Sequence, residues 1–170
     1  MYNFEKIKGE NLMFDNLQIK KRSQKEADEI ADYWKYPAPY DFYDMTADKE
    51  DYDEMIDPLA RGDKFFSITK DQELIGFFCV FPKEPTTNEI ELGLGMKPEL
   101  TGKGLGERFV KVIIEYLKGN YSGQVVWLSV ADFNQRALKV YEQVGFNYVT
   151  EKLQKTNGGE HNFIVMNNVK

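Results

Sequence analysis

The chain has 170 residues, which suits one domain with one sizeable core, and its composition is that of a globular protein, neither disordered nor fibrous. Its net charge of −6 argues against nucleic acid as a main partner, because binding to a phosphate backbone needs clustered Lys and Arg. The single cysteine, Cys79, excludes a disulfide within the chain and leaves too few soft ligands for a zinc site, so we expect no metal.

The start and the hydropathy of the chain predict a cytoplasmic protein without a membrane partner. No apolar run approaches the ~18 residues of a transmembrane helix, and the start of the chain has no signal-peptide core. A strand-like pattern begins only near Leu17. We therefore expect an N-terminal extension over residues 1–16, which would be a short extra element, a tail or a consequence of where the start codon was chosen, and a single domain over residues 17–170.

The first half of the domain is predicted to contain two helices. Residues 16–23 alternate between apolar and polar and form the first predicted strand. Ser23 and Glu26 make a capping-box signature, which predicts a helix over 24–34. Two prolines end that helix, and an irregular segment dense in aromatic residues follows. A second, acidic helix is expected over 47–60.

The middle of the chain is rich in predicted strands. Residues 64–70 and 73–81 flank a two-residue polar turn and are predicted to form a hairpin. Residues 88–96 form the next strand, and a glycine-rich loop follows it. An apolar stripe at helical spacing then predicts a helix over 105–117. The nearly continuous apolar run over 124–130 predicts a strand that is buried on both faces.

The last predicted elements are one helix and two antiparallel strands. The helix covers 134–145, with Asn134 as its N-cap and Gly145 as its C-terminal stop. The strands cover 146–154 and 161–169. The resulting order, β α α β β β α β α β β, predicts one α/β domain with a mixed sheet.

The glycine loop in "PELTGKGLGERF", which begins at Pro98, does not match the two common phosphate motifs. Lys97 stands where a Walker loop has its first glycine, and Gly104 stands where it has Ser or Thr. A dinucleotide fingerprint fails because Glu107 or Phe109 stands where its third glycine belongs. The loop is also late in the chain, so a nucleotide-binding protein is not predicted.

The physical chemistry of the loop still predicts an anion site. A helix N-terminus leaves backbone N–H groups without partners, and glycines let a ligand approach them closely without a metal. Lys103 adds a flexible charge, and Gly93 with Gly95 indicates a bulge that would splay strand 88–96 from strand 124–130. Such a cleft suits a long ligand with amides along its length and a diphosphate at one end. The alternative is a tight turn with no ligand.

Two segments in this region resemble the GNAT N-acetyltransferases. "PELTGKGLGERF" is similar to the acetyl-CoA loop of that family, Arg/Gln-x-x-Gly-x-Gly/Ala, with Thr101 at the Arg/Gln position. "NQRALKVYEQVGF" is similar to the second signature, Asn-x-x-Ala-x-x-x-Tyr-x-x-x-Gly-Phe. The matching residues are Asn134, Ala137, Tyr141, Gly145 and Phe146.

The resemblance implies a GNAT-like acyl-CoA N-acyltransferase fold. Its seven-stranded mixed sheet would be splayed between its fourth and fifth strands, with about four helices and with acetyl-CoA in the splay. Backbone groups would contact the pantetheine, a loop would wrap the pyrophosphate, and a helix N-cap would contact the cofactor's arm. The residues implied in cofactor binding are Leu94, Gly95, Met96, Thr101, Gly102, Lys103, Gly104, Leu105, Gly106, Glu107 and Asn134.

The same resemblance implies an acid and a base for acetyl transfer. Tyr141 would donate a proton to the departing thiolate, for which a phenol with an ordinary pKa of about 10 is suited. Glu91 would accept the proton of the amine, directly or through water. Two alternatives stay open: Tyr141 shares a helical face with Ala137 and Val144 as a core aromatic residue, and Glu91 is an ordinary solvated carboxylate.

The substrate side is expected in the aromatic segment between the first two helices. Aromatic faces and the carboxylates of Asp41 and Asp44 suit an ammonium group, although the aromatic residues would equally cover the core. No residue there selects among a polyamine, an aminoglycoside, an amino acid and a protein N-terminus. The predicted substrate-binding residues are Trp34, Tyr36, Tyr40 and Tyr43.

The sequence therefore predicts an acetyl-CoA-dependent N-acetyltransferase. It would transfer an acetyl group to the primary amine of a small molecule or peptide, by direct attack in a ternary complex, and the resemblance also implies a homodimer. The alternative is a non-catalytic acyl-CoA-binding or regulatory module on the same fold, which the Thr101 substitution keeps open.

Overall fold

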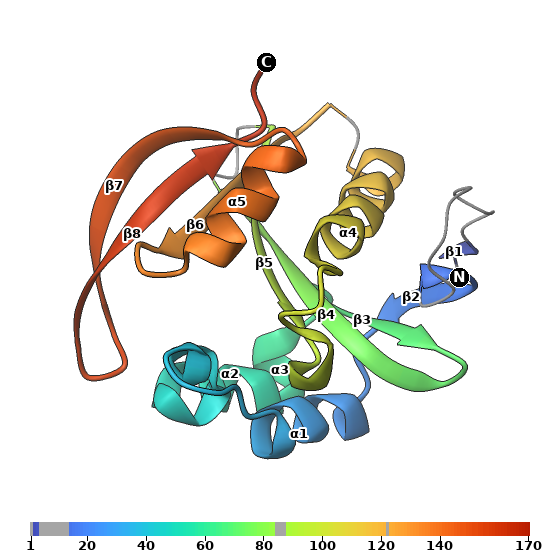
Figure 1. Cartoon of the computed structure of the whole chain (residues 1–170). Coiled ribbons are helices and arrows are strands. Elements are labelled where there is room, and N and C mark those ends of the chain that lie inside the picture. The colour runs from blue at the N-terminus through green and yellow to red at the C-terminus, as the bar shows by residue number, and fades with distance from the viewer. Residues whose placement is uncertain (1, 4–13, 84–87, 122) are drawn as a thin grey trace. The chain divides into compact units, whose positions relative to one another are not determined.

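The structure is a computed structural model of the chain, shown in Figure 1. It describes four ranges of residues, 2–3, 14–83, 88–121 and 123–170. No helix within these ranges is long and apolar enough to cross a membrane.

The chain forms two compact units, each made of two segments. The first unit comprises Met1–Cys79 and Leu94–Thr101, and the second comprises Val80–Gly93 and Gly102–Lys170. Two strands contain residues of both units, namely β4 (Glu73–Pro82) and β5 (Glu89–Met96). Whether the two units behave as one domain over residues 17–170 stays a prediction.

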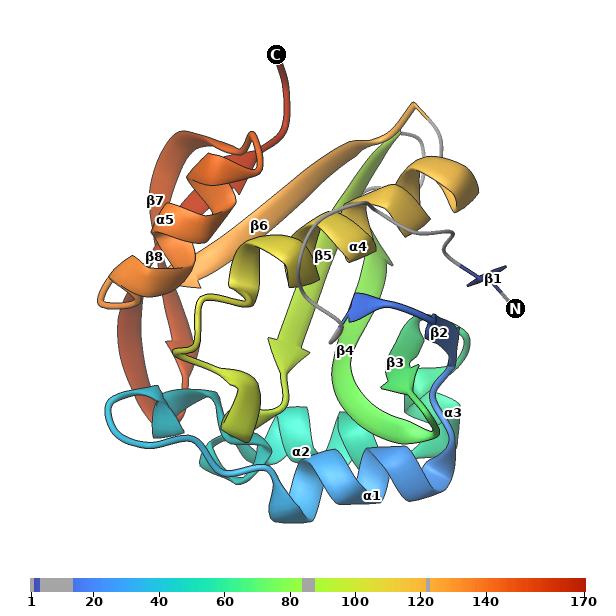
Figure 2. The same cartoon turned by 45° about the vertical axis from the view of Figure 1, so that its right-hand side comes forward.

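The strands of the first unit are antiparallel and follow the order β1-β2-β3-β4 (Figure 2). Asp71 and Gln72 connect β3 to β4 with φ angles of 48° and 69°. Positive φ at both central residues is the signature of a type I′ turn, which matches the twist of the flanking strands and confirms the predicted hairpin. The first strand is a two-residue addition within the expected extension. The first three strands of this unit are β1 (Tyr2–Asn3), β2 (Leu17–Lys21) and β3 (Phe65–Lys70).

Helix α1 (Gln24–Tyr33) begins with the predicted capping box. The Glu26 N–H donates to Ser23 Oγ at 3.3 Å, and the Ser23 N–H donates to Glu26 Oε2 at 2.9 Å. The apolar face of α1 then packs against residues from α2 and β4 in one buried cluster. The cluster contains Ala27, Ile30, Ala31, Trp34, Met55, Leu74 and Phe77.

The prediction of one continuous helix over 47–60 is wrong, because the chain forms two helices there, α2 (Lys49–Ile56) and α3 (Pro58–Arg61). Asp57 ends α2, and its carboxylate accepts a hydrogen bond from the Leu59 N–H at 2.9 Å, so it caps α3. Pro58 has no N–H with which to continue the ladder of α2 and is well suited to the first position of a helix. Two short 3₁₀ turns, Tyr40–Tyr43 and Met45–Ala47, occupy the aromatic segment.

The strands of the second unit follow the order β5-β6-β8-β7, with β5 parallel to β6 and the other pairs antiparallel. The pairing of β5 with β6 joins Glu89–Glu91 to Val125–Trp127 and ends there. Both strands continue beyond this point within the unit, which agrees with the expected splay. The last three strands of the chain are β6 (Val125–Ala131), β7 (Asn147–Thr156) and β8 (Gly159–Asn167).

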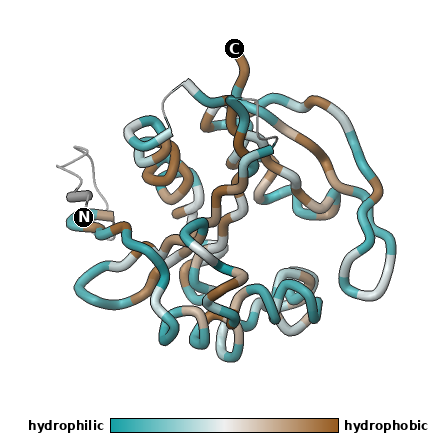
Figure 3. The backbone as a smooth tube through the Cα atoms, turned by 180° about the vertical axis from the view of Figure 1, so that it is seen from behind, coloured by the Kyte–Doolittle hydropathy of each residue, from teal (hydrophilic) through white to brown (hydrophobic). Residues whose placement is uncertain are grey.

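Helices α4 (Gly106–Asn120) and α5 (Gln135–Gln143) also belong to the second unit. The predicted apolar stripe of α4 is buried except for Tyr116, which is partly exposed, and Figure 3 shows the hydrophobic stretches of this helix. Asn134 caps α5, since its Oδ1 accepts a hydrogen bond from the Ala137 N–H at 3.1 Å, and Gly145 follows the helix with a φ of 102°. Both predicted boundaries of this helix are therefore confirmed.

Strand β6 differs from its prediction, because only one of its faces is buried. Val126, Leu128 and Val130 are buried, whereas Trp127 and Ser129 are partly exposed. Because nearly every residue of this segment is apolar, the sequence did not show that buried and partly exposed residues alternate along the strand. The partly exposed face carries a polar contact between Ser129 and a side chain of β5, so it is available to a site.

Candidate active site

The glycine loop that precedes α4 has the backbone conformation of an anion site. Gly102 and Gly104 have φ angles of 70° and 74°, which glycine adopts without a steric penalty. Leu105 follows in a right-handed conformation and gives α4 no side-chain cap. A left-handed residue followed by a right-handed one turns successive N–H groups toward a common point, and an uncapped helix start adds more unpartnered N–H groups. The loop can therefore bind an anion through its backbone alone.

The three loop glycines have different surroundings. A Cβ added at Gly104 would meet no atom within 4 Å, so this side of the loop is open to a ligand. A Cβ added at Gly106 would lie 3.1 Å from Cγ2 of Val140, so Gly106 lets α4 pack closely on α5. A Cβ added at Gly102 would lie 3.1 Å from Nη1 of Arg136. The open side at Gly104 and the adjacent N–H groups fit a phosphate group.

The side chains of the loop contribute less than its backbone. Thr101 Oγ1 donates to the Pro98 carbonyl at 2.7 Å, so this hydroxyl is used within its own turn. Glu107 forms an ion pair with Lys111 at 2.6 Å along α4, which leaves its backbone as the part available to a ligand. Lys103 is exposed and can reach an anion from outside.

The C-terminal end of β5 is held by close contacts within the first unit. A Cβ added at Gly95 would lie 2.5 Å from Cζ of Phe77, so only glycine allows this ring to lie on the strand. The Tyr36 hydroxyl donates to the Met96 carbonyl at 2.8 Å. Burial, assisted by the negative charge of Asp44, raises the pKa of the Tyr36 phenol, which keeps it protonated as a donor. Tyr36 thus fixes the Met96 peptide.

Tyr141 is half-buried on α5, and its ring meets that of Phe146 edge-on at 6.1 Å between centroids. The Tyr141 carbonyl also accepts a hydrogen bond from the Phe146 N–H at 3.0 Å. These contacts fix the ring at the end of the helix and are compatible with both of its expected roles. Tyr141 therefore stays a predicted acid.

Glu91 has two polar neighbours that the sequence alone did not indicate. The Ser129 hydroxyl donates to Glu91 Oε1 at 3.3 Å, and Lys152 Nζ lies 3.9 Å from the same oxygen. The Glu91 side chain is 45% exposed, so a substrate can reach it. Ser129 lies two residues beyond Trp127, the β6 partner of Glu91, and thus on the same face. The strand register, once known, would have predicted this contact.

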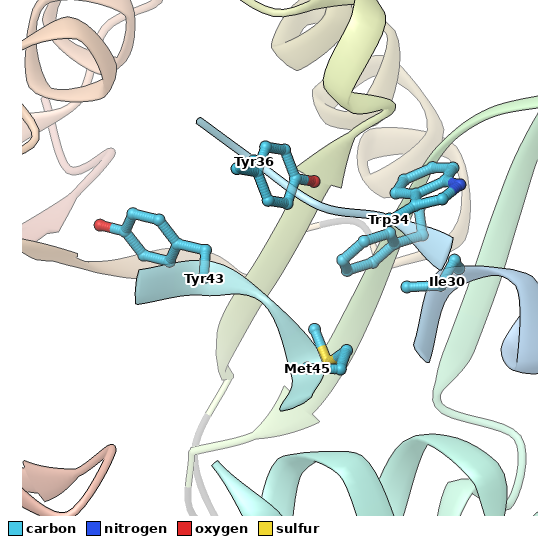
Figure 4. A pocket seen from close by; sticks show the side chains of 6 residues that line it. Ile30, Trp34, Tyr36, Tyr43 and Met45 are labelled. Carbon is cyan, nitrogen blue, oxygen red and sulfur yellow. The ribbon is translucent and has the colours of Figure 1, made fainter. Parts of the chain in front are cut away.

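The aromatic segment of the first unit lines a small pocket (Figure 4). Three of the four predicted substrate-binding residues, Trp34, Tyr36 and Tyr43, belong to its lining, whereas Tyr40 does not. Its volume of about 10 Å³ holds roughly one water molecule. An amine could enter only if side chains moved. The remaining lining residues are Ile30, Met45 and Phe77.

Trp34 makes packing contacts within the first unit. Its side chain is only 4% exposed, and its ring lies 5.7 Å from that of Phe77. Its indole N–H donates to Glu29 Oε1 at 3.3 Å. Substrate contacts by the four predicted residues, Trp34, Tyr36, Tyr40 and Tyr43, stay predictions. Among the residues that the structure describes, no group of three or more His, Cys, Asp and Glu side chains could hold a metal ion.

Comparison with known families agrees with these features. The model of the "Acetyltransferase (GNAT) family" matches residues 27–146, which include the glycine loop and all of α5. The chain belongs to this family. The resemblance expected from the two sequence signatures is therefore confirmed.

Individual GNAT relatives are similar over shorter stretches. Acetyltransferase PseH of Campylobacter jejuni is 33% identical over 88 residues, which are 52% of this chain and 54% of PseH. Mycothiol acetyltransferase of Streptomyces coelicolor is 30% identical over 106 residues, 61% of this chain and 34% of that protein. The spermine/spermidine N(1)-acetyltransferase of Bacillus subtilis is 34% identical over 47 residues, 28% of this chain and 31% of that protein. The chain spans about half or less of the length of these relatives.

Solved GNAT structures confirm the expected fold over most of the chain. A spermidine N-acetyltransferase SpeG chimera from Vibrio cholerae and hSSAT has a TM-score of 0.71 at 19% identity, covering 89% of this chain and 93% of that one. The yncA protein of Salmonella typhimurium, solved with its cofactor acetyl-CoA, has a TM-score of 0.62 at 14% identity, covering 89% and 92%. At these identities the likeness shows the fold alone.

Proposed function

We propose that this protein is an acetyl-CoA-dependent N-acetyltransferase that acetylates a primary amine by direct attack in a ternary complex. The observation that carries the proposal is the loop before α4. Gly102 and Gly104 have positive φ there, and Leu105 leaves the helix without a side-chain cap, in a chain of the GNAT family. This combination provides backbone N–H donors and the positive end of the helix dipole, both of which stabilise a bound diphosphate.

Acetyl-CoA would supply a thioester, whose carbonyl carbon is the group that the amine attacks. In the proposal, the N–H groups of residues 102–107 hold its diphosphate. Backbone groups of residues 94–96 hold the pantetheine, for which the fixed peptide of Met96 is suited. Asn134 contributes through atoms other than Oδ1, which caps α5.

Two side chains would move the protons of the reaction. Glu91 would accept the proton of the amine, directly or through water, and the hydroxyl of Ser129 would hold its carboxylate in place. Tyr141 would donate a proton to the thiolate as it departs. Each step of this kind is typically worth ~10²–10⁴-fold in rate. Binding both reactants together contributes much of the remainder.

Polyamines are the first class of amine to test. The Bacillus subtilis relative is named for spermine and spermidine, and the Vibrio cholerae chimera for spermidine. The chain has a net charge of −6, which favours a cationic substrate. In the first unit, Asp44 accepts a hydrogen bond from the Tyr36 N–H at 2.9 Å and places a carboxylate beside the aromatic segment. The homodimer implied by the sequence also stays a proposal.

One observation favours a second candidate function, a non-catalytic acyl-CoA-binding module. Thr101 occupies the Arg/Gln position of the loop, and its hydroxyl is bonded to Pro98, so it brings no charge to a phosphate. A weaker cofactor site would suit a sensor as well as an enzyme. The two candidates differ in turnover and agree in CoA binding.

The test is a CoA-release assay with acetyl-CoA and a panel of polyamines, amino acids, aminoglycosides and short peptides. We expect thiol release with one amine class. Tyr141→Phe should lower turnover ~10²–10⁴-fold and leave the CoA dissociation constant nearly unchanged, because only the hydroxyl is lost. Tyr148→Phe on β7 is the matched control, since Tyr148 is 59% exposed, and it should leave turnover unchanged. CoA binding without release for any amine would favour the second candidate.

A further inference from the structure

A cationic side chain from α5 lies against the glycine loop. Arg136 is the second residue of α5, and its Nη1 lies 3.1 Å from the position that a Cβ at Gly102 would occupy. The guanidinium therefore lies beside Gly102, on the side where this residue has no side chain. Arg136 is exposed, so a ligand bound to the loop can reach it.

The position of this charge within α5 is electrostatically unfavourable for the helix itself. A cation in the first turn opposes the helix macrodipole, at a typical cost of ~0.3–1 kcal/mol when exposed. The first turn of α5 contains no acidic residue. The arrangement instead adds positive charge where the loop already presents backbone donors. Backbone donors and a cation in one place favour binding of an anion.

The geometry of an arginine side chain suits the same ligand. Its planar guanidinium offers two parallel N–H donors, which match two oxygens of a phosphate group. Thr101, the residue at the Arg/Gln position of the loop, has its hydroxyl bonded to Pro98 and carries no charge. The loop thus has no cation at its Arg/Gln position, and the nearby positive charge of Arg136 comes from α5.

We propose that Arg136 binds the diphosphate of CoA and replaces the cationic or amide side chain that Thr101 does not provide. This inference rests on the proposed function, because it requires that CoA binds the loop. Arg136 would be a cofactor-binding residue with no part in proton transfer. The phosphate that it contacts is the diphosphate, because Gly102 lies in the segment proposed to wrap that group.

The test measures the dissociation constant of CoA by calorimetry for the wild type, Arg136→Gln and Lys139→Gln. Lys139 is the matched control, since it is exposed on the same helix and its substitution removes the same charge. We expect binding to weaken about tenfold or more in Arg136→Gln, as for loss of a charge-assisted contact, and less than about twofold in Lys139→Gln. The same loss should appear with 3′-dephospho-CoA.

Three outcomes would overturn the inference. Unchanged CoA affinity in Arg136→Gln would remove this side chain from the site. If Lys139→Gln weakened CoA binding equally, the effect would reflect the loss of one positive charge anywhere on the helix and not a contact made by Arg136. A loss that disappears with 3′-dephospho-CoA would move the contact from the diphosphate to the 3′-phosphate.

Failure of the wild type to bind CoA is a separate result, because it would reject the proposed function itself. Thermal unfolding of Arg136→Gln shows whether the variant is folded, so that a loss of CoA affinity can be assigned to the lost side chain.

Discussion

The contact between Gly95 and Phe77 shows how one missing Cβ positions the end of β5. Phe77 is 8% exposed and belongs to the cluster under α1, so its ring is held by neighbours and lies directly on the strand. The next residue, Met96, is held by Tyr36. Packing and a hydrogen bond thus fix adjacent residues of the segment that we propose for the pantetheine.

Gly95→Ala should therefore reduce the free energy of unfolding by ~1–3 kcal/mol, because the new methyl group overpacks a filled core. Urea unfolding of the purified variant would measure it. A double-mutant cycle with Phe77→Leu tests the cause, since removal of the ring should make Gly95→Ala less costly. Additive losses in the cycle would show that the ring is not what excludes the Cβ.

At the scale of elements, those with local signals were predictable and those set by tertiary contacts were not. The capping box of α1 and the stop at Gly145 depend on residues within one or two turns, and both are confirmed. The break between α2 and α3 was also encoded locally, by Pro58 after a capping aspartate, but the acidic run around it favoured one helix. The burial of β6 depends on which other elements cover each of its faces, and the residues of the strand itself do not indicate this.

The candidate site divides in the same way. The glycine loop and the α5 signature are contiguous segments, so the sequence alone indicated them. Tyr36 and Met96 are 60 residues apart, and Glu91 and Ser129 are 38 apart, so only the folded chain brings each pair together. Arg136 stands inside a recognised signature, yet its approach to Gly102 depends on how α5 packs beside the loop.

The capping box of α1 also makes a prediction about pH. Burial by itself raises the pKa of the Glu26 carboxyl, but hydrogen bonds from the Ser23 backbone, Lys20 and the Ser23 side chain outweigh it, so the pKa is lowered. A folded pKa below the unfolded value, about 4.3, stabilises the protein above that value. The stabilisation is lost as the pH falls through the folded pKa.

Glu26→Gln should therefore cost about 0.5–1 kcal/mol of unfolding free energy at neutral pH, since the glutamine keeps the acceptor and loses the charge. The cost should shrink as the pH falls through the folded pKa, because the wild-type carboxyl then becomes protonated as well. Urea unfolding followed by circular dichroism at neutral pH and at a series of acidic pH values would measure the difference. A cost that persists in acid would assign the effect to packing instead of charge.

At the scale of the whole molecule, the question is whether the two units unfold together. Strands β4 and β5 each contain residues of both units, so neither unit can unfold without disrupting a strand of the other. This continuity favours the single domain predicted over residues 17–170. The chain has two tryptophans, and each unit holds one of them, Trp34 in the first and Trp127 in the second.

Trp34→Phe and Trp127→Phe therefore give two proteins whose fluorescence reports on one unit each. In each variant we expect the urea midpoint from fluorescence to coincide with the midpoint from far-ultraviolet circular dichroism, because a single cooperative transition gives the same midpoint by every probe. The comparison is made within one protein, so the destabilisation caused by either substitution cancels. Helices occur in both units and contribute to the circular dichroism signal. Two independent domains would instead give a fluorescence midpoint displaced from that signal in at least one variant.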